Sequence, residues 1–327
     1  MANHMTPDSS AAVRVHGLSK IYRHNNPFKR NREPAIRSLD LEVPSHQAFG
    51  LLGLNGAGKT TLVKILLGLL SPTTGSVEVL GGDIRNRSVR SRVGYLPELP
   101  YFPKAMTARE LLHYFGFLYG FRGAALRKKV DAILERVRLT HAADNRIAEY
   151  SKGMQQRVGL GQAIIGGPEL LLCDEPISGL DPVGCKEVRD IFLELKSEGT
   201  TLFFNTHILS EVEKVCDWVG ILHEGTLKRV ARVSEVLSSE QELDYWVEVD
   251  AAWIDSLVGF PYRESVGKAG GFQVAGGDLA RVMGELSTRG VKVGGVRPLS
   301  SLVEHFFLST IGRESELLYS NRREVHS

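Results

Sequence analysis

The chain has 327 residues, of which 43% are hydrophobic and 24% are charged, and its formal net charge at pH 7 is +2. This length and composition are typical of a globular protein with a large core and about two domains, and the near-neutral charge provides no field that would attract nucleic acid. The three cysteines show no metal-ligand spacing and favour a reducing compartment.

The sequence offers no membrane-spanning segment. The best apolar run, residues 65–70, is far shorter than the roughly 18 residues that cross a bilayer. Residues 1–12 are polar, lack the apolar core of a signal peptide, and are predicted to be a disordered tail. Any role at a membrane is therefore expected to come through a partner.

The first part of the chain alternates predicted strands with turns. Residues 13–22 indicate an opening strand, and residues 35–43 and 76–80 indicate two more. Between the first two, residues 24–34 form a predicted loop with three basic residues. A solvated loop is the favoured interpretation, and contact with lipid headgroups or a partner is the alternative.

A glycine-rich segment follows a short apolar strand predicted at 47–52. Residues 53–61, Gly-Leu-Asn-Gly-Ala-Gly-Lys-Thr-Thr, fit the phosphate-binding pattern G-x-x-x-x-G-K-[ST], in which backbone N–H groups surround a phosphate. A helix predicted over 59–70 adds the positive end of its dipole. In this pattern Lys59 reaches the β- and γ-phosphates and Thr60 holds Mg²⁺. Because a buried strand and an amphipathic helix flank the loop, nucleotide binding is favoured over a chance glycine-rich turn.

A helical segment follows a short strand at 93–98, which runs into a proline-bounded loop at Glu98. Thr107 and Glu110 form a capping-box pattern that opens a helix. Apolar residues between 126 and 137 recur at helical spacing, and Ser151 is the predicted N-cap of a third helix. These helices are expected to form a subdomain at about 98–165, inserted between strands.

Two carboxylates end the buried strand predicted at 170–175. Asp174 at such a strand end can hold Mg²⁺, and Glu175 directly after it is placed to accept a proton from an attacking water. An idle, solvated acidic pair is the alternative, and the phosphate loop upstream makes it the weaker one.

The elements that follow continue the alternation of strands and helices. Asp181 is a predicted N-cap, and its helix should end at Gly199. His207 follows a strand at 200–205, and two further strands form a predicted hairpin about residues 224–225. The alternation predicts an α/β fold with a mainly parallel sheet over residues 13–238.

The composition changes after residue 238. The pattern predicts a small α+β accessory domain at 239–313 and a loose polar tail at 314–327. The predicted strands of this domain are 245–249, 271–275 and 291–296, and the predicted helices are 252–257, 278–289 and 300–309. It contains no second phosphate-loop pattern, so it is not a duplicated ATPase.

The order of these motifs resembles the ATP-binding-cassette (ABC) family of transporter ATPases over about residues 13–237. The motifs are residues 53–61, the loop at Glu98, Tyr-Ser-Lys-Gly-Met at 150–154, residues 170–175, residues 178–181, and His207. The resemblance implies an ATPase that uses ATP and Mg²⁺ and forms a homodimer or heterodimer of head-to-tail domains. It also implies a separate transmembrane permease and a peripheral location on the cytoplasmic face of the membrane.

The resemblance implies roles for individual residues. Glu175 is the general base, Lys59 and His207 contact the γ-phosphate, and Mg²⁺ is held by Thr60 and Asp174, with Glu98 as a further ligand. Tyr22 is placed to stack on adenine, and an ordinary strand-end tyrosine is an equal alternative. The remaining contacts to ATP come from Asn55, Gly56, Ala57, Gly58, Thr61 and, across the dimer interface, Ser151, Gly153 and Asp181.

Two positions depart from the usual pattern of the family. Lys152 stands where the family's signature segment, here residues 150–154, usually has glycine, and Glu98 stands where its loop usually has glutamine. These variants resemble a branch of bacterial exporters of the ABC-2 type, so the leading hypothesis is the ATPase subunit of an exporter. The alternatives are a soluble ABC ATPase acting on ribosomes or nucleic acid, and a regulator that binds ATP without hydrolysing it. The sequence does not reveal the cargo.

Overall fold

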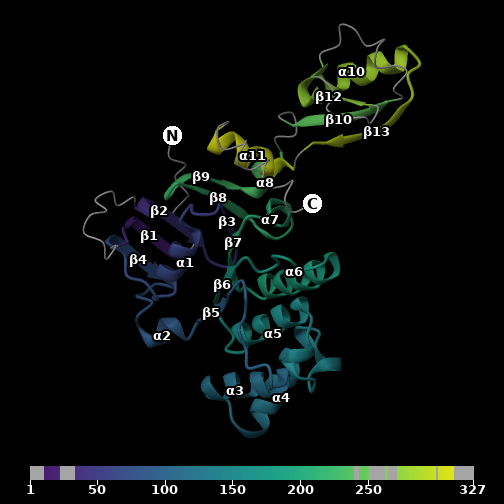
Figure 1. Cartoon of the computed structure of the whole chain (residues 1–327). Helices are drawn as coiled ribbons and strands as arrows, with labels where there is room; N and C mark the ends of the chain where they lie inside the picture. Colours follow the sequence, from purple (N-terminus) through teal and green to yellow (C-terminus); the bar gives the residue numbers. More distant parts are fainter. Residues whose placement is uncertain are drawn as a thin grey trace, which may run out of the picture. The chain divides into compact units, whose positions relative to one another are not determined.

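The computed structural model describes residues 11–22, 34–238, 243–249, 262–263, 271–299 and 301–312 (Figure 1). The chain divides into two compact units, Met1–Val230 and Ala231–Ser327. The boundary predicted after residue 238 lies on the other side of helix α8 (Val233–Leu237), and the domain assignment stays a prediction. The predicted loop at 24–33, the helix at 252–257 and the tails at 1–10 and 314–327 lie outside the described residues.

The larger unit is built on a six-stranded sheet in the order β5-β6-β7-β3-β8-β9. Neighbouring strands from β5 to β8 run parallel, as predicted. Glu224 and Gly225 join β8 to β9 with φ values of +48° and +75°, a left-handed pair typical of tight hairpin turns. The strands are β3 (Ala48–Leu52), β5 (Val93–Leu96), β6 (Leu170–Asp174), β7 (Thr201–Thr206), β8 (Trp218–His223) and β9 (Thr226–Arg232).

A second, antiparallel sheet in the same unit has the order β2-β1-β4. Its strands are β1 (Ala11–Lys20), β2 (Ile36–Pro44) and β4 (Thr74–Val79). The sequence predicted all three strands but not that they form a sheet of their own. Strand β1 begins inside the predicted tail 1–12, because Ala12 is fully buried and pairing with β2 starts at Ala11.

Helices cover both faces of the parallel sheet. Helix α1 (Lys59–Leu66) contacts one face and also β4, whereas α6 (Pro182–Ser197) and α7 (Leu209–Val215) contact the other (Figure 1). Side chains alternate along each strand, so Phe203 stacks on Phe49 with ring centroids 5.6 Å apart, and Phe204 meets Phe192 of α6 at 4.8 Å. Helix α1 is four residues shorter than predicted, since Gly68 leaves the helical region with φ +69°.

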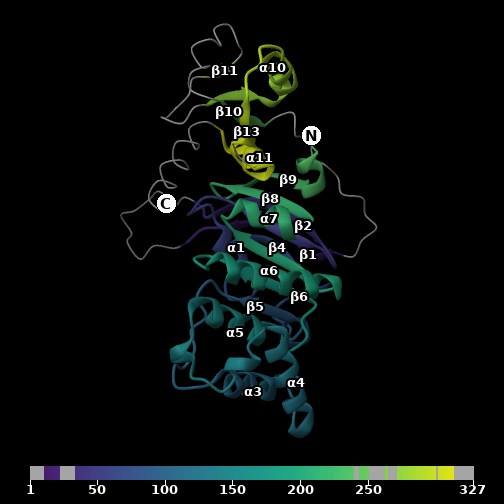
Figure 2. The same ribbon diagram turned by 90° about the vertical axis from the view of Figure 1, so that its right-hand side faces the viewer.

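A helical subdomain is inserted between β5 and β6. It contains α3 (Ala108–Leu118), α4 (Gly123–Arg136) and α5 (Lys152–Ile164), which lie together at the end of the unit away from β8 and β9 (Figures 1 and 2). A short helix, α2 (Arg87–Arg90), precedes β5. The predicted capping box opens α3, with the Thr107 hydroxyl accepting the Glu110 N–H at 3.1 Å. Helix α6 is followed by Gly199 with φ +92°, as predicted.

The smaller unit contains a four-stranded antiparallel sheet in the order β11-β12-β10-β13. Its strands are β10 (Asp244–Val249), β11 (Tyr262–Arg263), β12 (Gly271–Ala275) and β13 (Val293–Pro298). Helix α10 (Gly276–Thr288) packs on β10 and β12, and α11 (Leu302–Ile311) packs against α8. Among the described residues, none of the helices has both the length and the apolar character needed to cross a membrane.

Candidate functional site

The loop between β3 and α1 forms one wall of a cleft of about 360 Å³. Gly56 and Gly58 have φ values of +86° and +106°, which glycine adopts without strain. A Cβ on Gly58 would lie only 2.4 Å from the carbonyl oxygen of Ala35, and one on Gly53 would lie 2.4 Å from that of Leu222. The course of the loop therefore depends on glycine at these positions.

Lys59 begins α1 and lies buried beneath the loop, with 7% of its surface exposed. Its ammonium group donates hydrogen bonds to the carbonyl oxygens of Gly53 at 2.6 Å and Leu54 at 3.4 Å. Burial lowers the pKa of Lys59, and the carboxylates of Glu175 and Asp174 oppose this effect. The loop thus holds a cation inside the cleft, where phosphate oxygens can become its partners.

Carboxylates line the opposite side of the cleft. Asp174 ends β6, and its Oδ1 accepts a hydrogen bond from Asn205 Nδ2 at 2.6 Å. Burial raises the pKa of Asp174, and the nearby carboxylates of Glu175 and Glu98 raise it further. Glu98 is exposed and also lines the cleft. Because these acidic groups repel one another, a cation bound among them would be stabilised.

Glu175 and His207 contact each other directly in this conformation and form an ion pair when the imidazole is protonated. His207 Nδ1 lies 2.8 Å from Glu175 Oε1, and Glu175 Oε2 accepts from the Thr206 hydroxyl at 3.2 Å and the His207 N–H at 3.3 Å. The hydrogen bond to Glu175 raises the pKa of His207. Glu175 itself has φ +46°, and its N–H donates to the Asn205 carbonyl at 2.8 Å, so β7 fixes its position.

Asn205 and Thr206 contribute to the site and were not predicted. Both lie at the carboxyl end of β7, which pairs in parallel with β6. Polar residues at the carboxyl ends of neighbouring parallel strands meet at one edge of a sheet, where α/β proteins bind ligands. The available signal was that the polar residues Asn205 and Thr206 directly follow the apolar run 202–204, but the sequence did not show that β6 and β7 are neighbours.

The donor set of the cleft fits Mg²⁺. Thr60, Asp174 and Glu98 supply hydroxyl and carboxylate oxygens, the donors that this ion prefers. The Oδ1 atom of Asn205 is buried without a hydrogen-bond partner in the described part of the chain, which suits water bound to an ion. The described residues hold no group of three or more histidine, cysteine or acidic side chains arranged for a metal, so phosphates would have to complete the coordination.

Tyr22 lies beside the loop but does not line the cleft. Its hydroxyl is 3.1 Å from the Thr61 hydroxyl, and 44% of the residue is exposed. The ammonium of Lys20 lies 5.6 Å from the centre of its ring. The ring is therefore accessible next to the loop, as stacking on a base requires.

Ser151, Gly153 and Asp181, the residues expected to reach ATP across the dimer interface, are not part of this cleft. Ser151 caps α5, accepting the Met154 N–H at 3.2 Å, and Asp181 caps α6, accepting the Gly184 N–H at 2.7 Å. A Cβ on Gly153 would meet nothing closer than 4.0 Å. One chain therefore brings together the loop, the carboxylates and His207, but not the signature segment.

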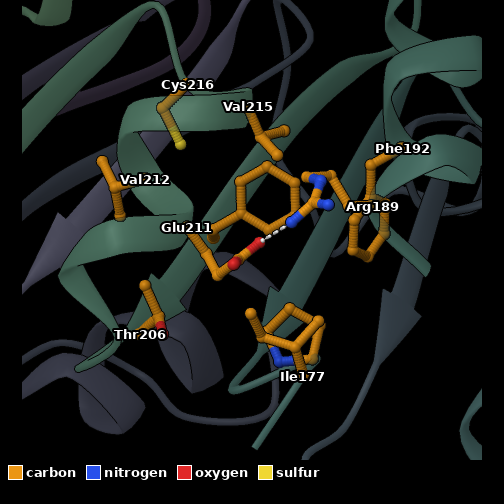
Figure 3. A pocket seen from close by; sticks show the side chains of 10 residues that line it. Ile177, Arg189, Phe192, Thr206, Glu211, Val212, Val215 and Cys216 are labelled. Carbon is orange, nitrogen blue, oxygen red and sulfur yellow. Dashed lines mark hydrogen bonds and ion pairs between the residues drawn. The ribbon is translucent and has the colours of Figure 1, made fainter. Parts of the chain in front are cut away.

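A second, small pocket lies between α6, α7 and β7 (Figure 3). Its volume is about 30 Å³, room for about one water molecule. The lining is apolar apart from Thr206 and an ion pair between Arg189 and Glu211, whose Nη1 and Oε2 atoms are 2.9 Å apart. The pocket is too small for a nucleotide, but its walls pack against β7, the strand that His207 follows.

The parallel sheet, the glycine-dependent loop before α1 and the carboxylates after β6 together define a phosphate-loop nucleotide triphosphatase. A profile of the ABC transporter family matches residues 36–178. A solved structure of the ATP-binding subunit of an ABC transporter matches 69% of this chain and 92% of that chain, with a TM-score of 0.60 and 28% identity.

Two relatives extend this match over most of the chain. An uncharacterized ABC transporter ATP-binding protein of Synechocystis sp. is 42% identical over 242 residues, which are 73% of this chain and 68% of the relative. The bacitracin transport ATP-binding protein BcrA of Enterococcus faecalis is 34% identical over 289 residues, which are 85% of this chain and 91% of the relative. The chain belongs to the ABC transporter family, and it is an ATP-binding subunit that hydrolyses ATP. These relatives do not favour the soluble ATPase acting on ribosomes or nucleic acid.

Proposed function

We propose that this chain drives an exporter through ATP-dependent pairing of two ATPase subunits, each ATP lying between two copies. The proposal rests on the observation that one chain brings together only part of the predicted ATP site. Five of the predicted groups, namely the loop, Glu98, Asp174, Glu175 and His207, line one cleft. Ser151, Gly153 and Asp181 lie at helix N-termini outside it, so a second copy would have to supply them.

The binding steps follow from the positions of the side chains. The loop amides, the N-terminus of α1 and Lys59 bind the phosphates. Thr60, Asp174 and Glu98 would hold Mg²⁺, and the ion would supply positive charge that neutralises the phosphates. Asn205 keeps Asp174 in place through its 2.6 Å hydrogen bond. Asn55, Ala57 and Thr61 line the loop side of the cleft.

Glu175 acts as the general base. A water aligned with the γ-phosphate transfers its proton to the carboxylate, whose position is set by Thr206 and the backbone of His207. In this conformation the imidazole of His207 pairs with Glu175 Oε1, so that oxygen is not free to accept a proton from water. When ATP binds, the His207 side chain rotates toward the γ-phosphate and releases this oxygen of Glu175. ATP binding thereby makes the general base available.

A separate permease is the expected partner, with this chain peripheral on the cytoplasmic face. A groove of about 420 Å³ lies next to the loop that carries Glu98, and it is lined mainly by proline and aromatic residues. Tyr101 is 93% exposed and Leu99 is 68% exposed, an apolar surface suited to a permease segment. The name of BcrA refers to bacitracin transport, which supports a role in transport, and export as the direction rests on the variants at Glu98 and Lys152.

The Glu175→Gln variant tests the catalytic assignment. The amide keeps the size of the side chain but cannot take the proton, so ATP binding should persist while phosphate release falls about 10²–10⁴-fold. Turnover near the wild-type rate would remove Glu175 as the base. Co-purification with a detergent-solubilised membrane protein supports the exporter, whereas co-sedimentation with ribosomes would support the soluble alternative.

A further inference from the structure

One side of helix α6 carries a line of acidic residues. Glu187, Asp190, Glu194 and Glu198 follow one another at intervals of three or four positions, so they lie on the same helical face. Each is paired with an arginine of the helical subdomain. We call this set of four ion pairs the charge ladder.

The charge ladder joins α6 to both α5 and the end of α4. Arg138 Nη1 lies 3.3 Å from an Asp190 carboxylate oxygen, and its Nη2 lies 3.6 Å from one of Glu194. Arg136 at the end of α4 donates from Nη1 to Glu198 at 2.8 Å. These pairs are between about one-third and one-half exposed, so each contributes little alone, whereas several on one helical face act together.

The fourth pair is the most buried. Arg157 lies 3.4 Å from Glu187, and 9% of the arginine side chain is exposed. Its Nη1 also donates to the carbonyl oxygens of Val137 at 3.3 Å and Arg138 at 3.0 Å. Arg157 therefore connects the carboxyl end of α4 with α5 and α6.

This buried pair lies close to the two helix N-termini that carry the predicted partner contacts. Arg157 comes six residues after Ser151, and Glu187 comes six residues after Asp181, about 9 Å along each helix axis. The Arg157–Glu187 ion pair therefore connects α5 and α6 near their N-termini. A change in the relative position of Arg157 and Glu187 would move Ser151, Gly153 and Asp181 with respect to Asp174 and Glu175.

We propose that the charge ladder is a positioning device for hydrolysis. It holds the subdomain that carries Ser151 and Gly153 at the angle to the sheet at which these residues reach the nucleotide of a second copy. The inference rests on the proposed pairing of two subunits. Folding of the subdomain does not depend on the half-exposed pairs, because α4 and α5 bury apolar residues of their own, including Leu126, Ile133 and Leu160.

The test is Arg138→Glu in the full chain, which turns two attractions into repulsions. We expect KM for ATP to stay unchanged and kcat to fall about fivefold to tenfold, since only the composite site is disturbed. Adding Asp190→Lys and Glu194→Lys should restore kcat, because the pairs re-form with reversed charge. Arg127→Glu reverses the charge of an exposed arginine of α4 outside the charge ladder; it is the control and should keep kcat.

Dimer formation separates this inference from the proposed function. With ATP, Glu175→Gln should form a dimer in gel filtration, and Glu175→Gln with Arg138→Glu should require at least about fivefold more protein to do so. Equal dimerisation together with unchanged kcat would overturn the charge ladder. Failure of Glu175→Gln alone to dimerise would overturn the proposed pairing, and the ladder's role with it. If Arg138→Glu does not fold, Asp190→Asn with Glu194→Gln, which keeps the shapes, gives the same readouts.

Discussion

At the scale of single residues, the contact between Glu175 and His207 makes stability depend on pH. The hydrogen bond to Glu175 raises the pKa of His207 above its ordinary value of 6.5. Because the folded form holds the proton more tightly, the pair's contribution is fully present below the unfolded pKa and is lost as pH rises through the folded pKa.

The direction of this pH dependence can be measured with the variant His207→Gln. Urea unfolding of the wild type and the variant between about pH 5.5 and about pH 9 should show a difference in unfolding free energy of about 0.5 kcal/mol at the acid end, typical of a half-exposed pair. The difference should shrink as pH rises above the ordinary histidine value. A difference that grows with pH would contradict the ion pair.

Lys59 gives a second prediction at this scale. Its ammonium is buried and bonded only to loop carbonyls among the described residues, so its removal by Lys59→Ala takes away the charge that meets the phosphates. Nucleotide affinity should fall about thirtyfold or more, in contrast to Glu175→Gln, which should retain binding. Titration with a fluorescent ATP analogue measures the loss, and unchanged affinity would show that the loop amides suffice.

At the scale of elements, the phosphate loop depends on backbone shape. Gly58→Ala forces a non-glycine residue to φ +106° and places its Cβ 2.4 Å from a carbonyl oxygen. Local strain of roughly 1–3 kcal/mol should move the loop and abolish tight ATP binding. Gly120→Ala is the control, because Gly120 has φ +97° but open space around it. It should cost some stability and leave affinity unchanged; equal affinity in both variants would refute the steric argument.

The elements that were predictable from sequence carry local signals. Capping residues such as Thr107, Ser151 and Asp181 mark the starts of α3, α5 and α6, and the structure confirms all three. Helix α7 was missed because it has only seven residues and its N-cap, Ile208, provides no side-chain hydrogen bond. Packing against β3 and the Arg189–Glu211 pair hold it in place, and neither is visible in a short sequence window.

The same distinction explains what could be predicted of the candidate site. The loop, Asp174, Glu175 and His207 follow local patterns, and the structure places them in one cleft. Asn205 enters only because β7 lies between β6 and β3, an order that differs from the order along the chain. The separate β2-β1-β4 sheet escaped prediction for the same reason, since strand spacing alone does not say which strands pair.

At the scale of the whole molecule, the two compact units have separate apolar cores. The core of the larger unit includes Phe49, Leu62 and Phe203, whereas that of the smaller unit includes Val247, Phe272 and Leu286. A unit that buries its own core can unfold on its own. The predicted nucleotide contacts all lie in the larger unit, so ATP should stabilise only that unit.

Calorimetry of Glu175→Gln, which should bind ATP without consuming it, tests this independence. We expect two unfolding transitions, one for each unit. ATP with Mg²⁺ at about 100 times the Kd should raise the midpoint temperature of the larger unit's transition by about 5–10 °C, which corresponds to about 2.7 kcal/mol of binding energy. The smaller transition should not move, and Lys59→Ala should abolish the shift. A single transition that shifts as a whole would show instead that the accessory unit unfolds together with the ATPase, and would make it a candidate for reporting nucleotide occupancy to a partner.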